Sequence, residues 1–129
     1  MMCEEKKFFV CKHCGNLVGI IHNSKVPMIC CGEPMAELVP NSTDAAAEKH
    51  VPVVEVKENL VTVCVGSVPH PMTKEHHITW IFLKTLDGGQ RKCLDPEGEA
   101  KAEFALTDGD KAVAAYAYCN LHGLWKADI

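Results

Sequence analysis

Four cysteines near the start of the chain constrain its fold more than any other feature. They stand at Cys11, Cys14, Cys30 and Cys31, in the pattern Cys-x2-Cys-x15-Cys-Cys, and a glycine follows each pair. Glycine readily adopts the positive φ that lets two nearby sulfur atoms point at one ion. The first segment, of about 35 residues, cannot bury enough apolar surface to fold unaided. We therefore predict a four-thiolate metal site that stabilises it, with disulfides or free thiols as the alternative.

The composition limits what the whole chain can be. It has 129 residues, of which 47% are hydrophobic, and eight cysteines. No apolar run approaches the ~20 residues of a membrane span, and the first residues lack the apolar core of a signal peptide. We therefore expect a cytoplasmic protein, in which reduced thiols favour metal binding over disulfides. The net charge of −4 and the lack of interleaved basic and aromatic residues give no reason to expect a nucleic-acid partner or a membrane.

The adjacent pair Cys30-Cys31 is unusual for a zinc ribbon, whose second cysteine pair is normally separated by two residues. The four-cysteine pattern resembles that of desulforedoxin, a family of small Fe(Cys)4 proteins. The resemblance implies iron at this site, although the spacing alone does not separate iron from zinc. With four thiolates available, His13 and His22 are expected to face solvent, and Cys3 is expected to be a spare thiol.

The second part of the chain reads as a series of short strands. Turn formers and small residues from Val39 to Ala47 predict a linker, so the domains are expected at residues 1–37 and 38–129. Strand patterns follow at 51–56, 59–66, 78–83, 90–94, 102–106 and 112–118, with no helical repeat between them. Turns are expected at Asp87-Gly88-Gly89 and at 107–110. This arrangement predicts a mainly β fold, with an antiparallel β-sandwich after the small metal-stabilised domain.

A second set of metal donors is spread over this part. Cys119 and His122 leave a predicted buried strand three residues apart, and His50, His70 and His76 each stand at an expected strand end or turn.

Local sequence supports two of these candidate ligands and excludes three neighbouring candidates. Two prolines stiffen the loop around His70 and lower the entropy cost of fixing its side chain. His76 shares strand parity with Ile78, Trp80 and Phe82, so we expect it to point inward and His77 to point outward. Cys64 and Cys93, within strands, are expected to be small buried hydrophobes and not ligands.

The motifs around these residues resemble superoxide reductase. They are Glu48-Lys49-His50, His70-Pro71-Met72-x2-Glu75-His76 and Cys119-Asn120-x-His122-Gly123-x-Trp125. With the four-cysteine segment in front, the whole chain resembles desulfoferrodoxin, the two-iron form. The resemblance implies a desulforedoxin-like domain joined to an immunoglobulin-like sandwich, with two irons per chain.

The resemblance also implies roles and partners. The activity is that of an oxidoreductase, the one-electron reduction of superoxide to hydrogen peroxide at an Fe(His)4(Cys) centre. Glu48 corresponds to the carboxylate that occupies the sixth position of the oxidised iron, and Lys49 to the lysine that attracts superoxide. Rubredoxin is the implied electron donor and a homodimer the implied assembly. The donor set agrees with this chemistry, because five ligands leave one position open and a thiolate donates electron density toward it.

Two other classes of protein share parts of the pattern. A blue-copper electron carrier uses two histidines, one cysteine and usually a methionine after the second histidine, but no methionine follows His122 here. A zinc-stabilised interaction module would use the four cysteines only. The colour and metal content of the purified protein separate the three possibilities.

Overall fold

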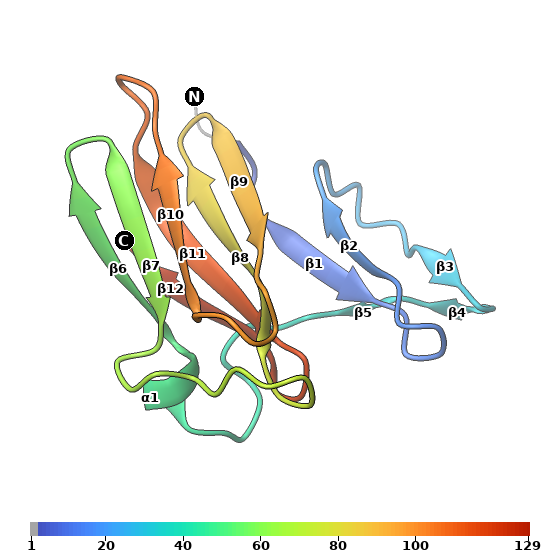
Figure 1. Ribbon diagram of the computed structural model, residues 1–129. Helices are drawn as coiled ribbons and strands as arrows, with labels where there is room; N and C mark the ends of the chain where they lie inside the picture. The colour runs from blue at the N-terminus through green and yellow to red at the C-terminus, as the bar shows by residue number, and fades with distance from the viewer. Residues whose placement is uncertain (1–2) are drawn as a thin grey trace. The chain divides into compact units, whose positions relative to one another are not determined.

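The chain separates into two compact units in the computed structural model, which describes residues 3–129. One unit spans residues 3–39 and the other residues 40–129 (Figure 1). Residues 1 and 2, which were included in the expected first domain, lie outside the described residues. Each unit carries its own sheets and its own cluster of metal-binding side chains.

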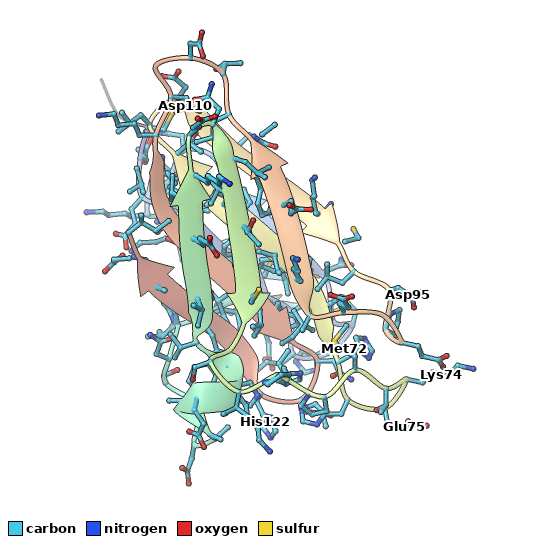
Figure 2. All side chains as sticks on the ribbon, turned by 60° about the vertical axis from the view of Figure 1, so that its left-hand side comes forward. Met72, Lys74, Glu75, Asp95, Asp110 and His122 are labelled. Atoms are coloured by element: carbon cyan, nitrogen blue, oxygen red, sulfur yellow. The ribbon has the colours of Figure 1, made fainter. Side chains whose placement is uncertain are left out.

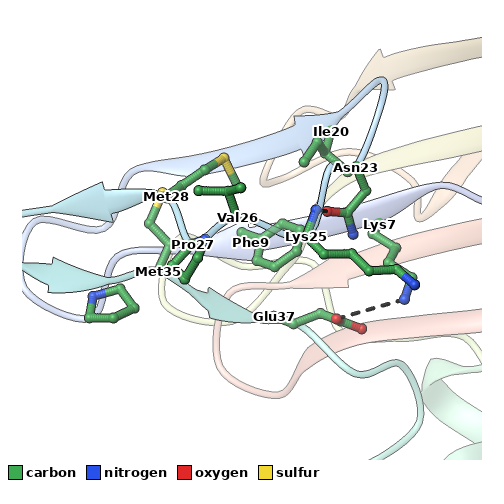
Figure 3. Close-up of a pocket in the computed structure, with 11 residues that line it drawn as sticks. Lys7, Phe9, Ile20, Asn23, Lys25, Val26, Pro27, Met28, Met35 and Glu37 are labelled. Carbon is green, nitrogen blue, oxygen red and sulfur yellow. Dashed lines mark hydrogen bonds and ion pairs between the residues drawn. The ribbon is translucent and has the colours of Figure 1, made fainter.

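The small unit is built from five short strands. A three-stranded antiparallel sheet has the order β2 (Leu17–Ile20), β1 (Lys7–Val10) and β5 (Ala36–Glu37), and β3 (Ile29–Cys30) pairs with β4 (Glu33–Pro34). Within residues 3–39, Phe8 and Cys11 are the buried hydrophobic residues. Other apolar side chains, including Phe9, Met28 and Met35, line an open hollow of about 480 Å³ (Figure 3). The unit therefore has almost no closed core, as expected of a fold that depends on a metal.

The large unit is a sandwich of two antiparallel sheets. One has the order β10 (Lys101–Ala105), β7 (Leu60–Val65), β6 (Pro52–Lys57), and the other β12 (Gly123–Asp128), β11 (Ala112–Cys119), β8 (Ile78–Thr85), β9 (Gly88–Cys93). The predicted alternation in β7 is confirmed, because Val61, Val63 and Val65 are buried while the residues between them are more exposed. These valines pack against Phe104 and residues of β8 and β11 in the core. The expected mainly β fold is confirmed.

The apolar face of β8 differs from the expectation. Trp80 and Phe82 were expected on the inner face, but the core contains Ile78, Ile81 and Leu83. The pairing of β8 with β11 shifts between Trp80 and Ile78, which marks a β-bulge at Thr79. The bulge moves the residues beyond it to the other face, and simple alternation cannot anticipate this shift.

Other elements also differ from the prediction. β12 was not predicted, because its buried residues Leu124 and Trp125 are adjacent and do not alternate with polar ones. β9 begins at Gly88, so the turn is shorter than expected. A single helical turn, α1 (Ala47–His50), begins at the last residue of the predicted linker. Among residues 3–129, no helix has the length and apolar character needed to cross a membrane.

A close backbone approach fixes α1 against the loop that follows β7. A Cβ atom on Gly66 would lie 2.6 Å from the carbonyl oxygen of Glu48, so only glycine fits there. The same oxygen accepts a hydrogen bond of 2.8 Å from the backbone N–H of Val68. The Glu48–His50 segment is therefore held by backbone contacts to this loop.

We predict that Gly66→Ala lowers the free energy of unfolding by about 1–3 kcal/mol, because the added methyl group must displace backbone atoms. Chemical unfolding of the metal-loaded protein measures the change. Gly98→Ala is the matched control, since its Cβ would lie 3.2 Å from the Asp95 Cβ and 3.5 Å from the nearest backbone atom, the Asp95 carbonyl oxygen, which is an ordinary contact. Equal stability of the two variants would contradict the packing described.

Candidate metal centres

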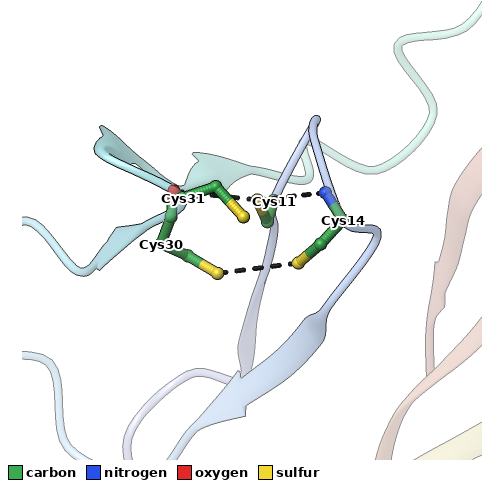
Figure 4. Close-up of side chains that lie close together, drawn as sticks. All are labelled: Cys11, Cys14, Cys30 and Cys31. Carbon is green, nitrogen blue, oxygen red and sulfur yellow. Dashed lines mark hydrogen bonds between the residues drawn. The ribbon is translucent and has the colours of Figure 1, made fainter.

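The first candidate centre gathers the four cysteines of the small unit. The sulfur atoms of Cys11, Cys14, Cys30 and Cys31 all lie within 4.8 Å of one another (Figure 4). Cys31 has φ +52° and the following Gly32 has φ +77°. These two left-handed residues turn the chain sharply, which is how adjacent cysteines point both sulfurs at one centre.

The acidities of these thiols fit a cluster that binds a cation. Hydrogen bonds from the backbone N–H groups of Cys14 and His13 lower the pKa of Cys11 to about 6. Hydrogen bonding with the Cys14 and Cys11 sulfurs, together with burial, raises the pKa of Cys31 to about 12. One sulfur thus ionises readily, while a neighbour resists adding a second negative charge. A bound metal cation removes this conflict, because it stabilises all four thiolates.

The second candidate centre lies at one end of the sandwich. Figure 2 shows His122 at the same end as Met72 and Glu75, opposite the turn that carries Asp110. The predicted donors come from separate segments: α1, the β7–β8 connection, the end of β11 and the β11–β12 turn. Donor atoms of His50, His76, Cys119 and His122 lie within 4.8 Å of one another. His70 borders this group, with its Nε2 atom 3.2 Å from His50 Nε2.

The four imidazole rings form a closed cycle. Neighbouring ring centroids are 4.6 Å apart for His50–His70 and His70–His76, and 5.0 Å apart for His76–His122 and His122–His50. Neighbouring rings lie at 77° to 86° to one another, while His50 and His76 face each other across the cycle at 6.4 Å. This arrangement points ring nitrogens toward a shared centre. Cys119, which is fully buried, adds a sulfur atom 3.9 Å from His122 Nδ1.

Backbone carbonyls set the protonation of two of these rings. His50 donates its Nδ1–H to the Ala46 carbonyl, and His70 donates its Nδ1–H to the Pro71 carbonyl, each at 2.7 Å. A carbonyl cannot donate, so both Nδ1 atoms carry the proton, and in a neutral ring Nε2 then holds a lone pair. The two Nε2 atoms face each other at 3.2 Å with no proton to share. Such a contact is repulsive unless a cation lies between the nitrogens.

Burial favours the neutral form of His50, His70 and His76. It lowers the pKa of His70 to about 4, and it also lowers the pKa of His50 and of His76. The charges of neighbouring groups, including that of Lys49, lower the pKa of His50 and His76 further. Neutral imidazole is the form that binds a metal.

His76 provides a direct test of fit to a metal. Its Nε2 atom is buried and has no hydrogen-bond partner among the described residues. Buried polar atoms of this kind are rare and require an explanation. A metal ion bound by the four imidazoles and Cys119 gives Nε2 its partner and removes the lone-pair repulsion. The residues therefore fit a metal with nitrogen and sulfur ligands.

The other residues considered from the sequence are three histidines outside both clusters and two charged residues next to His50. His77 turns away from the cluster and donates its Nδ1–H to the Thr73 carbonyl at 2.9 Å. His13 and His22 are exposed and contact Glu33 and Glu4. Glu48 and Lys49 are exposed residues of α1, directly before His50.

Three cysteines stand outside both clusters. Cys3 is exposed. The expectation that Cys64 and Cys93 are buried is wrong, because Cys64 is half-buried and Cys93 is exposed. Both side chains lie on the more exposed positions of their strands, which the apolar content of the segments did not reveal.

Sequence reasoning assigned no role to Asn120, which links two of the donor segments. Its side chain donates to the Glu75 carbonyl and accepts from the His77 N–H, both at 2.9 Å. His76 is thereby tied on both sides to the turn that carries Cys119. Asn120 follows Cys119 directly, but only the fold brings it beside residues 75–77.

Comparisons with known proteins agree with this geometry. The family model described as desulfoferrodoxin matches residues 42–128, and the model of the desulfoferrodoxin N-terminal domain matches residues 3–38. A desulfoferrodoxin from Nitratidesulfovibrio vulgaris is 44% identical over 127 residues, covering 98% of this chain and 99% of that protein. A superoxide reductase from Pyrococcus horikoshii is 40% identical over 105 residues, covering 68% of this chain and 91% of that protein.

A solved structure shows the same likeness. The crystal structure of the superoxide reductase from Treponema pallidum aligns with a TM-score of 0.82 and 42% identity. The alignment covers 97% of this chain and 100% of that chain. The match extends over both units of the chain. The chain belongs to the desulfoferrodoxin family.

Proposed function

We propose that this chain is a superoxide reductase with two iron centres. The observation that carries the proposal is the convergence of four imidazoles and one buried thiol at one end of the sandwich. Five ligands of this kind leave one position of a six-coordinate iron open. Desulfoferrodoxins and superoxide reductases of similar sequence support the assignment of the reaction.

The ligand atoms follow from the hydrogen bonds. His50 and His70 would bind through Nε2, because their Nδ1 atoms donate to carbonyls. His76 would bind through its unpartnered Nε2, and His122 through Nδ1, which lies 3.2 Å from His50 Nε2. Cys119 would add its sulfur as the fifth ligand.

His50, His70, His76, His122 and Cys119 would hold the iron, which when bound would supply the one electron that superoxide needs. Superoxide, one electron and two protons give hydrogen peroxide, and no dioxygen is released. Cys119 contributes electron density that favours this transfer. With one thiolate and four imidazoles as ligands, a bound ferrous ion would leave a net charge of about +1 at the site, which would suit an anionic substrate.

Lys49 and Glu48 act at the entrance to the centre. Both are exposed, and both stand within two residues of His50. Burial is the main reason that the pKa values of His50 and His76 are lowered; the positive charge of Lys49 lowers both further, and Glu48 raises that of His50. We propose that Lys49 attracts superoxide and that Glu48 binds the oxidised centre after the reaction. Backbone contacts from Gly66 and Val68 hold this segment in place.

The Fe(Cys)4 centre would be held by Cys11, Cys14, Cys30 and Cys31. We further propose a domain boundary near residues 37–38, rubredoxin as the electron donor, a homodimer as the assembly and the cytoplasm as the location. These four rest on the resemblance of the motifs, together with the family matches to both parts of the chain.

The reaction is tested by its stoichiometry. The pre-reduced protein is exposed to a known amount of superoxide, and peroxide and dioxygen are measured. One peroxide per superoxide, without dioxygen, is expected. One peroxide for every two superoxide ions, with dioxygen released, would instead indicate a dismutase.

The two centres are expected to be separable. Cys30→Ser removes one thiolate from a unit with little core, so we predict loss of one iron per chain and greater hydrogen exchange in residues 3–39. Superoxide reduction by the pre-reduced protein is expected to persist, because the sandwich has its own core. Cys93→Ser is the control, since Cys93 is an exposed thiol outside both clusters. Two irons retained in Cys30→Ser, or activity lost with the second iron still bound, would contradict the two-centre assignment.

Lys49 is expected to accelerate the encounter with superoxide. At a separation of roughly 6 Å, its attraction for a unit anion is about 0.7 kcal/mol in bulk water and about 2.8 kcal/mol at an effective dielectric constant near 20. Lys49→Ala is therefore predicted to lower the second-order rate constant by roughly threefold to a hundredfold at low salt. Lys49→Arg is expected to lose much less. Pulse radiolysis across ionic strengths measures these rates.

Lys57→Ala is the matched control, because it removes the same charge from the end of β6 that lies away from α1. Added salt is expected to narrow the difference between wild type and Lys49→Ala, since it screens the attraction. A rate constant for Lys49→Ala equal to that of Lys57→Ala at low salt would exclude Lys49 from substrate capture.

A further inference from the structure

Trp125 touches two of the proposed iron ligands at once. It lies on β12 and is 3% exposed. Its ring stacks on the His50 imidazole, and its indole N–H donates to the backbone carbonyl of His122. We propose that Trp125 is a positioning residue that fixes His50 and His122 relative to one another. The inference rests on the proposed function only in taking this cluster as a metal centre.

The stacking contact fixes the plane of the His50 ring. The Trp125 and His50 ring centroids are 4.8 Å apart, with 28° between the planes. The hydrogen bond from His50 Nδ1 to the Ala46 carbonyl holds one edge of the imidazole but still permits rotation about that bond. The indole face removes this freedom, because a rotated imidazole would collide with it. Trp125 therefore keeps His50 Nε2 aimed at the centre.

The hydrogen bond fixes the turn that carries His122. Trp125 Nε1 lies 3.1 Å from the His122 carbonyl oxygen. Gly123, between them, has φ +78°, so the turn reverses sharply and brings the indole back under the carbonyl. Holding this carbonyl sets the orientation of the His122 backbone, from which the imidazole extends. His50 and His122 are 72 positions apart in the sequence. A single buried side chain thus joins them.

The chain offers a matched comparison, because it contains two tryptophans. Trp80 is also buried in the sandwich unit, at 7% exposure, and it stacks on Tyr118 with 5.6 Å between centroids and 7° between planes. Truncating either tryptophan removes a similar apolar volume from the same unit. Trp125 stacks on a proposed ligand ring, whereas the ring that Trp80 stacks on, Tyr118, is not a proposed ligand. The pair therefore separates a positioning effect from a general loss of packing.

The test uses the iron-loaded full chain and three variants: Trp125→Leu, Trp125→Phe and Trp80→Leu. Loss of iron from the histidine-rich centre to a chelator is followed together with the electron paramagnetic resonance spectrum of its ferric form. The absorption of the Fe(Cys)4 centre in the same molecule is the internal reference. Substitution of a residue that orients a metal ligand typically lowers metal affinity 10–100-fold. We expect Trp125→Leu to weaken iron binding by about this factor and to alter the ferric spectrum.

The other two variants complete the test. Trp125→Phe keeps an aromatic face on His50 but loses the N–H donor, so it is expected to retain iron better than Trp125→Leu. Its ferric spectrum is expected to shift, and this shift tests the positioning role of Trp125 even if Trp125→Leu does not fold. Trp80→Leu is expected to retain iron like wild type. The inference is overturned by a wild-type spectrum in Trp125→Phe, by wild-type iron retention in a folded Trp125→Leu, or by equal iron loss in Trp80→Leu.

The result does not depend on superoxide chemistry. A wild-type protein that binds iron tightly but does not reduce superoxide would contradict the proposed reaction and leave the role of Trp125 standing. Conversely, an active wild-type protein whose Trp125 variants keep wild-type iron binding and spectra would contradict the role of Trp125 alone.

Discussion

The contact between two imidazole nitrogens that have no proton to share is the constraint on which the second centre depends. His50 and His70 each give their Nδ1 proton to a backbone carbonyl, which leaves their Nε2 lone pairs 3.2 Å apart. His76 adds a buried nitrogen without a partner. In a protein interior, such groups are costly unless a cation joins them. This arrangement of donors is therefore favourable only with a metal bound, and a bound metal would join three distant segments of the chain.

The two centres contribute differently to the stability of their units. In residues 3–39, Phe8 and Cys11 are the buried hydrophobic residues, so the thiolate cluster replaces a core. The sandwich has a continuous apolar core and does not need a metal for that purpose. Its loops are instead free to bring ligands together at one end, and the exposed Glu48 and Lys49 directly precede the ligand His50 in α1. This division suits a protein in which one iron stabilises its domain and the other performs the chemistry.

The sequence predicted the mainly β fold and the grouping of the donors, because spacing and strand patterns are local properties. Alternation placed the valines of β7 correctly. It failed in β8, where the bulge at Thr79 reverses the faces, so that Trp80 is buried outside the main apolar cluster. The contacts that orient the ligands were also missed. The carbonyl of Ala46 and the indole of Trp125 gain their roles only when distant segments meet, so no local pattern reveals them.

The binding of a single iron by four imidazoles and one thiolate can be measured by X-ray absorption at the iron edge of Cys30→Ser, in which only the second centre is expected to hold metal. Four nitrogen scatterers from imidazole and one sulfur scatterer are expected, with His70 among the nitrogens. The additional variant His70→Ala is then expected to show three imidazoles. Two or more sulfur scatterers, or an unchanged count in His70→Ala, would contradict the assignment.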